Sequence, residues 1–350
     1  MELLSSRSII VTCGPGGVGK TTTAAALGLA AAELGRRVVV VTIDPARRLA
    51  DALGLGGELS NEPARVELDN VPGELWATML DAKQTFDGVV TRHASNPDQA
   101  QRILENSFYR NISSALSGTH EYMAAERLFD LHHDSRFDLV VVDTPPTRNA
   151  LDVLDAPERL TRFLDHRLYR ALIMPTRGYL RVANAATQLF VKSAARVVGA
   201  EVVADAMAFF LAFDGMEAGF RKRSTDVLSL MRSDAAAFVM VCAPRHDSVA
   251  ETHWLIGRLA DRGLTPSALI VNRAHPEFGV PYAEAQRRRD ESPAWHNLAE
   301  LAQVAQAESA LVAPLAALLA PAPVVTISLR ATDIHALTGL RDVATDLLER

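Results

Sequence analysis

The chain has 350 residues, of which 48% are hydrophobic and 22% charged, a balance typical of a globular protein with a large buried core. Its formal net charge of −6 argues against a protein that works through nucleic-acid backbone contacts, and two cysteines, Cys13 and Cys242, are too few for a disulfide framework. The first residues lack the apolar segment of a signal peptide, so we expect a cytoplasmic protein.

Short apolar runs, rich in β-branched residues and bounded by turn signals, predict buried strands. An alanine-rich segment after the first run ends before Gly35, where a helix-terminating glycine belongs. Strand, helix and strand in this order form a βαβ unit, which makes the two strands parallel. The sequence therefore predicts an α/β fold with a doubly wound, mostly parallel sheet. The expected strands are Ile9–Val11, Val38–Ile43, Leu139–Val142, Phe238–Val241, Ala268–Val271 and Val324–Ile327, with Leu75–Leu80 as a further one.

Two regions without strand signals are expected to be helical. We assign residues 1–157 and 236–350 to the core, with a helical insertion at about 82–131, and residues 158–235 to a separate α-helical subdomain. Large flexible and aromatic side chains concentrate in this subdomain between Met207 and Phe220. An ordinary core helix accounts for them best, and a groove for an apolar helix is the alternative.

A glycine-rich motif follows the first predicted strand. It reads Gly14-Pro15-Gly16-Gly17-Val18-Gly19-Lys20-Thr21-Thr22 and fits the pattern GxxxxGK[ST]. The glycines let backbone amides approach phosphate oxygens, and the following helix directs its N-terminus at the negative charge. Lys20 would reach the outer phosphates, and the Thr21 hydroxyl would ligate magnesium. The strand before and the helix after the motif favour a nucleotide site over a simple glycine-rich turn.

Polar residues follow three of the other predicted strands. The carboxyl ends of parallel strands share one edge of a sheet, so we expect Asp44 and Asp143 beside the phosphate loop. An aspartate there can hold the water shell of magnesium or orient the attacking water, although either residue alone could be a helix N-cap. Asn272 could read an adenine edge with its amide, or it could be a turn asparagine.

These motifs resemble a known family, which comprises the arsenical-pump ATPase and the targeting ATPase for tail-anchored membrane proteins. The phosphate loop resembles the family's deviant Walker motif, GKGGVGKTT. Residues 44–53 (DPARRLADAL) resemble its switch I, and residues 143–155 (DTPPTRNALDVLD) resemble its switch II. Residues 243–252 (APRHDSVAET) and 269–273 (LIVNR) are similar to its adenine-side segments. The resemblance covers nearly the whole chain in order.

The resemblance implies a dimeric P-loop ATPase that uses ATP and Mg²⁺. It implies that Lys20 and Asp44 are catalytic, with Asp44 activating water, and that Asn272 contacts adenine. It also implies that Thr21 and Asp143 hold the magnesium, Asp143 through a water molecule. The switch residues, which would couple hydrolysis to movement of the helical subdomain, are Asp51, Pro146, Thr147 and Arg148.

One departure from the family concerns the dimer. Pro15 replaces the lysine that crosses to the partner's phosphates in the family. A cation of this type is worth roughly 10³–10⁵ in rate, so a homodimer should hydrolyse ATP slowly unless Arg148 or Arg47 substitutes. Between a homodimer and a heterodimer with a paralogous ATPase that retains the lysine, we favour the heterodimer slightly.

Two other departures concern ligands. Arg245 stands where the family has a glutamate near the nucleotide, which leaves that contact open. The zinc-binding CxxC of the targeting ATPase is absent, and Cys13 and Cys242 cannot form the metalloid site of the arsenical pump. Because trivalent arsenic requires soft thiolates, we expect neither zinc nor directly bound arsenite.

The function expected from the resemblance is an ATPase that couples its nucleotide state to the handling of a hydrophobic protein segment or a membrane partner, with no nucleic acid involved. The alternative is a regulatory nucleotide switch of the septum-positioning or plasmid-partition type with little intrinsic hydrolysis. The tail at 342–350 has neither the membrane-binding helix nor the basic face of such switches. A compact ligase of the dethiobiotin-synthetase type is disfavoured by the large helical insertions.

Overall fold

The computed structural model describes residues 2–44, 48–57, 59–110, 119–145, 152–156, 158–159, 162, 196, 199–213, 215–276, 278–334 and 336–348. The chain divides into two compact units. The first, which we call the sheet unit, comprises Met1–Met79, Asp130–Leu151 and Arg232–Arg350. The second, the helical unit, comprises Leu80–Phe129 and Asp152–Met231.

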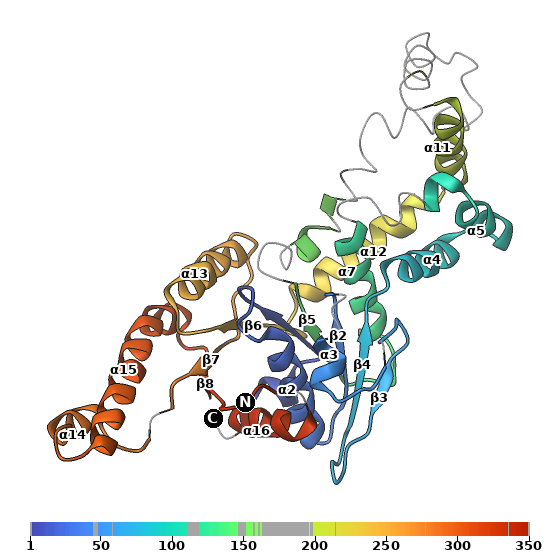
Figure 1. Ribbon diagram of the computed structural model, residues 1–350. Helices are drawn as coiled ribbons and strands as arrows, with labels where there is room; N and C mark the ends of the chain where they lie inside the picture. Colours follow the sequence, from blue (N-terminus) through green and yellow to red (C-terminus); the bar gives the residue numbers. More distant parts are fainter. Residues whose placement is uncertain are drawn as a thin grey trace. The chain divides into compact units, whose positions relative to one another are not determined.

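The sheet unit is built on an eight-stranded sheet with the strand order β3-β4-β2-β5-β1-β6-β7-β8 (Figure 1). Neighbouring strands pair in parallel except β3, which runs antiparallel to β4. The prediction of an α/β fold with a doubly wound, mostly parallel sheet is confirmed. The strands are β1 (Ile9–Cys13), β2 (Arg37–Thr42), β3 (Ala64–Val66), β4 (Glu74–Met79), β5 (Leu139–Asp143), β6 (Ala236–Cys242), β7 (Ala268–Ala274) and β8 (Val324–Ser328).

The central strands are apolar at almost every position, as strands covered on both faces are. β1, β5 and β6 are buried along their whole length. Helix α2 (Lys20–Glu33) packs against β2, and α16 (Leu337–Leu348) packs against α2. A Cβ atom at Gly28 of α2 would lie 2.5 Å from Cγ2 of Val40, so a glycine is needed for this close approach of helix and sheet.

The remaining helices described in the sheet unit are α1 (Leu3–Ser6), α3 (Arg48–Ala52), α13 (His246–Ala260), α14 (Tyr282–Arg287) and α15 (Pro293–Leu319). The longest is α15, which begins at a Ser292 cap and continues through Pro314. By length and composition it is the one described helix that could cross a membrane, and 17% of its apolar window is buried. A core helix of a soluble protein would be mostly buried, so α15 presents an unusually apolar surface.

The helical unit is formed by both predicted insertions. Its helices are α4 (Ala82–His93), α5 (Pro97–Leu104), most of α7 (Thr119–His132), α11 (Ala200–Ala212) and α12 (Glu217–Met231). Gln99 donates to the carbonyl of Ala212 at 2.7 Å, and Asn106 donates to the carbonyl of Asp205 at 3.0 Å. Because these contacts join the two insertions, residues 80–129 group with 152–231, whereas the sequence-based division kept 82–131 with the core.

The Met/Phe stretch from Met207 to Phe220 supplies the core of the helical unit. Phe209, Phe213, Met216 and Phe220 are each at most 6% exposed. The rings of Phe213 and Phe220 lie 4.9 Å apart, and Phe209 stacks on Tyr109. These contacts support the interpretation of an ordinary core helix. On the same α11, Val202 and Leu211 remain exposed.

A buried carboxylate joins helices of this unit. Glu126 on α7 is fully buried and accepts hydrogen bonds from Nε of Arg223 at 2.7 Å and from the Tyr122 hydroxyl at 2.5 Å. The Arg223 guanidinium also lies 3.8 Å from the ring centroid of Phe129. Burial, followed by the nearby Glu126 charge, raises the pKa of Tyr122. The carboxylate is thus paired as a buried charge must be.

Candidate functional site

The glycine-rich segment forms the turn between β1 and α2. Gly19 is the N-cap of α2 with φ 92°, a left-handed conformation that favours glycine. A Cβ atom at this position would lie 2.3 Å from Nδ2 of Asn272. Both the backbone conformation and the close contact with Asn272 therefore favour glycine at position 19. The backbone amides at the start of α2 are available to an anion, as they are at other anion-binding helix N-termini.

Lys20 closes over the loop. Its side chain is buried, and its Nζ donates to the carbonyls of Gly14 at 3.0 Å and Pro15 at 2.7 Å. Burial lowers the pKa of Lys20, and the nearby carboxylate of Asp143 opposes this shift. The ammonium group is thus held within the loop that would surround a phosphate.

Asp143 reaches the loop from the end of β5. Its Oδ2 accepts hydrogen bonds from the hydroxyls of Thr21 and Thr42, each at 2.9 Å. Its Oδ1 is buried and has no hydrogen-bond partner in the described part of the chain. Burial raises the pKa of Asp143 to about 6, although the two threonine hydrogen bonds and Lys20 act in the opposite direction. A buried carboxylate oxygen with unused acceptor capacity suits a cation better than a neutral neighbour.

A magnesium ion fits this oxygen-rich corner. The hydroxyl of Thr21 and the carboxylate of Asp143 are oxygen ligands of the kind that magnesium prefers. No group of three His, Cys, Asp or Glu side chains that could hold a metal occurs among the residues described. Magnesium needs no such cage, because it retains several waters and uses the phosphates of its nucleotide.

Asp44 lies two residues after Thr42, the last residue of β2. Its side chain is 30% exposed, and one carboxylate oxygen lies 4.0 Å from a guanidinium nitrogen of Arg48. Its charge acts on both Lys20 and Asp143, which places it near the loop, as the parallel sheet predicted. Asp51 is exposed on α3. The other predicted switch residues, Pro146, Thr147 and Arg148, lie outside the described residues, as does Arg47.

The end of β7 contacts the loop in a way that sequence reasoning missed. Nδ2 of Asn272 donates to the carbonyl of Val18 at 2.8 Å, and Nη1 of Arg273 donates to the carbonyl of Gly17 at 3.1 Å. The backbone N–H of Arg273 donates to Oδ1 of Asn272 at 3.0 Å. One amide hydrogen of Asn272 remains for a base, so loop contact and the predicted adenine contact are compatible. No sequence pattern predicts hydrogen bonds between residues that are more than 250 positions apart in the chain.

A small cavity of about 80 Å³ lies beside these residues. Gly19, Thr22, Asn272 and Arg273 line it, together with the end of β8, the segment that follows β8, and Val343 of α16. This is the edge at which the predicted adenine contact would occur. Arg245, at the N-cap of α13, is exposed and lies 3.7 Å from Asp247.

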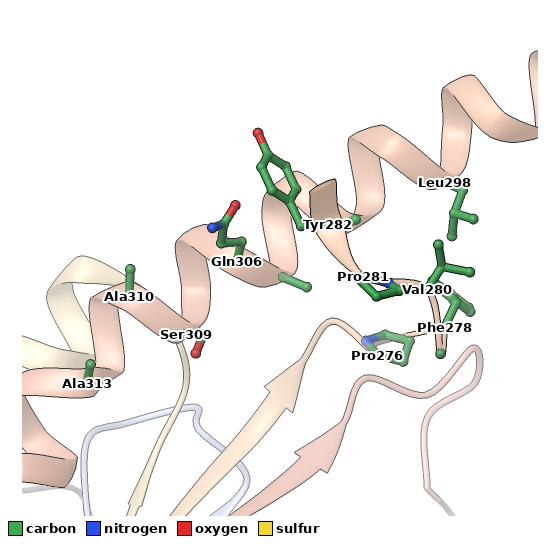
Figure 2. A pocket seen from close by; sticks show the side chains of 13 residues that line it. Pro276, Phe278, Val280, Pro281, Tyr282, Leu298, Gln306, Ser309, Ala310 and Ala313 are labelled. Atoms are coloured by element: carbon green, nitrogen blue, oxygen red, sulfur yellow. The ribbon is translucent and has the colours of Figure 1, made fainter. Parts of the chain in front are cut away.

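A larger hollow, which the sequence did not predict, lies against α15. Its volume is about 680 Å³, and Figure 2 shows apolar side chains around it, including Phe278, Val280, Pro281, Tyr282 and Leu298. Gln306 and Ser309 of α15 contribute polar atoms, and among the residues that the structure describes no acidic or basic side chain lines the hollow. The described lining can therefore accept an apolar group.

The two cysteines lie in the core of the sheet unit. Cys13 and Cys242 are both buried, and burial raises the pKa of each thiol to about 12. Burial therefore favours the protonated thiol of each side chain at neutral pH.

The fold and the loop together define a class. A glycine-rich turn at the carboxyl end of a central parallel strand, joined through Thr21 to the aspartate of the adjacent strand, is the arrangement of a P-loop nucleotide-binding protein. Comparison with known families identifies which family of P-loop proteins the chain belongs to. The model of the family described as anion-transporting ATPase matches residues 7–348, so the chain belongs to that family. The prediction of an ATPase of this family is thereby confirmed.

Relatives support the same assignment. The chain is 29% identical to an ATPase ASNA1 homologue of Babesia bovis over 76% of this chain and 66% of that protein. It is 26% identical to the ATPase GET3 of Malassezia globosa, over 78% of this chain and 75% of that protein. An uncharacterised protein of Streptomyces coelicolor is 32% identical over 77% of this chain and 63% of its own length. The match thus spans about two thirds of the Babesia and Streptomyces proteins.

Proposed function

We propose that the chain binds magnesium ATP at the Gly14–Thr22 loop and hydrolyses it to ADP and phosphate in the cytoplasm. The observation that carries the proposal is the 2.9 Å hydrogen bond between Thr21 and Asp143 beside the buried Lys20. The Thr21 hydroxyl and the Asp143 carboxylate are the groups expected around a metal. The hydrogen bond places them beside Lys20, the residue expected to contact the phosphates. Family membership makes ATP the expected nucleotide.

Each residue has a separate task in this proposal. The loop amides and Lys20 neutralise the phosphates, which requires Lys20 to exchange its bonds with Gly14 and Pro15 for phosphate oxygens. Asp44, partly exposed at the end of β2, orients the attacking water. Thr21 and Asp143 would hold a magnesium ion, which when bound would supply neutralisation of the charge on the phosphate oxygens.

The proposal is tested by ATP binding and ATPase rate of the full chain beside Lys20→Ala and Asp44→Asn. The lysine variant should lose binding, and the aspartate variant should bind ATP but lose turnover, because charge neutralisation and water orientation are distinct. Lys222→Ala is the matched control, since Lys222 is exposed and its ammonium group pairs with Asp226 at 2.6 Å on the surface. Identical behaviour of all four proteins would refute the proposal.

The dimer is the second element of the proposal. We infer that the active species is a heterodimer with a paralogous ATPase that retains the P-loop lysine, because Pro15 has no amine to reach a partner's phosphates. Light scattering of the chain alone and mixed with such a paralogue, each with ATP, tests this. If the chain alone forms a dimer that hydrolyses ATP as fast as the mixture does, the heterodimer proposal is contradicted. The homodimer is then the active species.

The helical unit is proposed to respond to the nucleotide and to handle a hydrophobic protein segment or a membrane partner. Support comes from the exposed Val202 and Leu211 on α11, since the side chains of Phe209 and Phe213 nearby are buried in the unit's own core. ATP-dependent release of a synthetic apolar helix from the full chain is the test. A chain that binds no such helix in any nucleotide state would not handle hydrophobic segments.

A regulatory switch that holds ATP with little hydrolysis remains the second candidate, and Pro15 favours it. Single-turnover kinetics distinguish the two functions. Retention of bound ATP by the wild-type chain, in the presence of a lysine-bearing paralogue, would indicate the switch.

A further inference from the structure

The carbonyls of two successive loop peptides are held from outside by the end of β7. Gly17 accepts from Arg273 at 3.1 Å, and Val18 accepts from Asn272 at 2.8 Å. We propose that Arg273 is a positioning residue for the phosphates, which orients and polarises the amide of Val18 toward a bound phosphate. This inference rests on the proposed function, since it concerns how the same loop binds its nucleotide.

Peptide geometry supplies the direction. In a planar trans peptide the carbonyl and the N–H of the following residue point in opposite directions. Because the carbonyls of Gly17 and Val18 point toward β7, the N–H groups of Val18 and Gly19 point away from it. Neither N–H takes part in a backbone hydrogen bond in the part of the chain that the structure describes. They are therefore free to donate to an anion, as loop amides do in phosphate sites.

The charge of Arg273 strengthens this arrangement. A hydrogen bond from a cationic donor is stronger than one between neutral groups, and it polarises the peptide whose carbonyl accepts it. The polarised Val18 N–H becomes a better donor to a phosphate oxygen. Arg273 also brings a positive charge to the rim of a loop in which Pro15 has replaced a cation.

The backbone of Arg273 adds an independent observation. Its φ is 63°, and Asn70 is the only other non-glycine residue with a positive φ among those described. An arginine seldom adopts this conformation, and such outliers concentrate at functional sites. Here the bond from its N–H to Oδ1 of Asn272 holds the conformation in place. The two residues therefore act on the loop as a unit.

The test replaces Arg273 without imposing strain. Arg273→Gly removes the guanidinium and suits the positive φ, and Arg273→Lys retains the charge. Asn70→Gly is the matched control, because it makes the same backbone change at an exposed turn of the sheet unit. For each full-length chain, affinity is measured for ATP and ADP by calorimetry and for adenosine by ligand-observed NMR.

We expect Arg273→Gly to weaken ATP and ADP binding roughly three- to tenfold, the size of one charged hydrogen bond at an exposed site. Adenosine binding should not change, because adenosine has no phosphate. Arg273→Lys should recover part of the loss, and Asn70→Gly should bind as the wild type does. A merely structural role would instead lower all three affinities together.

Two results would overturn the inference. One is unchanged ATP affinity in Arg273→Gly, and the other is an equal loss for adenosine. If the wild type binds ATP and Lys20→Ala does not, either result refutes the role of Arg273 alone. A wild-type chain that fails to bind ATP would refute the proposed function as well.

Discussion

Thr21 and Asp143 are 122 residues apart in sequence, yet their side chains meet in a 2.9 Å hydrogen bond. The sheet makes this contact possible, because β5 pairs with β1 and aligns Asp143 with Thr12, just before the loop. A parallel sheet delivers strand ends to one edge. The contact therefore depends on the order of the central strands more than on either residue's neighbours in sequence.

The burial of Asp143 predicts a conflict between stability and function. In the metal-free protein its folded-state pKa of about 6 exceeds the unfolded value, so the folded state binds more protons between pH 4 and 6. Its contribution to stability is fully present below pH 4 and falls by roughly 3 kcal/mol as pH rises through 6. Asp143→Asn should remove this dependence and stabilise the metal-free protein at pH 8. Urea unfolding of both proteins from pH 4 to 8 checks this.

The same variant should lose magnesium-dependent ATP binding, since an amide replaces the carboxylate beside Thr21. A difference in unfolding free energy between the two proteins that stays constant with pH would contradict the raised pKa.

The close approach of Asn272 to the loop predicts that Gly19→Ala is damaging. The new methyl group would meet Nδ2 of Asn272 at 2.3 Å, in a backbone conformation with φ 92°. We expect a loss of about 1–3 kcal/mol in unfolding free energy and weaker ATP binding, because either the loop or the Asn272 amide must shift and the backbone conformation disfavours alanine. Gly57→Ala is the control, as a Cβ atom there meets nothing within 4 Å. Equal stabilities of the two variants would argue against this packing of the loop.

For the buried pair of Glu126 and Arg223, we predict that one substitution lowers the unfolding free energy much more than replacing both residues together. Glu126→Ala removes the carboxylate that pairs with the largely buried Arg223 and should cost about 3–5 kcal/mol. A double variant, Glu126→Leu with Arg223→Met, should lose much less, because both charges of this pair are removed together. Lys222→Ala breaks an exposed pair and should cost less than about 1 kcal/mol. Denaturant titrations measure all three, and additive losses in the double variant would contradict the prediction.

The buried aromatic cluster predicts a stability effect rather than a binding effect for Phe220. Phe220→Ala removes a ring that packs on Phe213 and His93, and it should destabilise the helical unit by about 3–5 kcal/mol. Leu211→Ala, on the exposed side of α11, should change stability by at most about 0.5 kcal/mol. Thermal unfolding compares the two. If Phe220→Ala instead had normal stability but lost binding of an apolar helix, the Met/Phe stretch would be a binding groove and not a core.

The central strands and the phosphate loop could be predicted because their signals are local. Every predicted strand occurs, including the one expected over Leu75–Leu80, which forms β4. The antiparallel β3 was missed because its three residues, at the edge of the sheet, have almost no pattern. The grouping of the two insertions and the contacts of Arg273 depend on tertiary packing, which no local pattern encodes. The signal for Arg273, its positive φ, exists only in three dimensions.

The glycine that lets α2 approach the sheet also restricts where movement can occur. With Gly28 against Val40 and alanines buried along its length, α2 has no room to slide or rotate without clashes. This helix begins at Lys20 and Thr21, so under the proposed function the groups assigned to the phosphates and the metal would belong to a stationary frame. Rearrangement during turnover would then be expected in other segments, with α2 as the fixed reference.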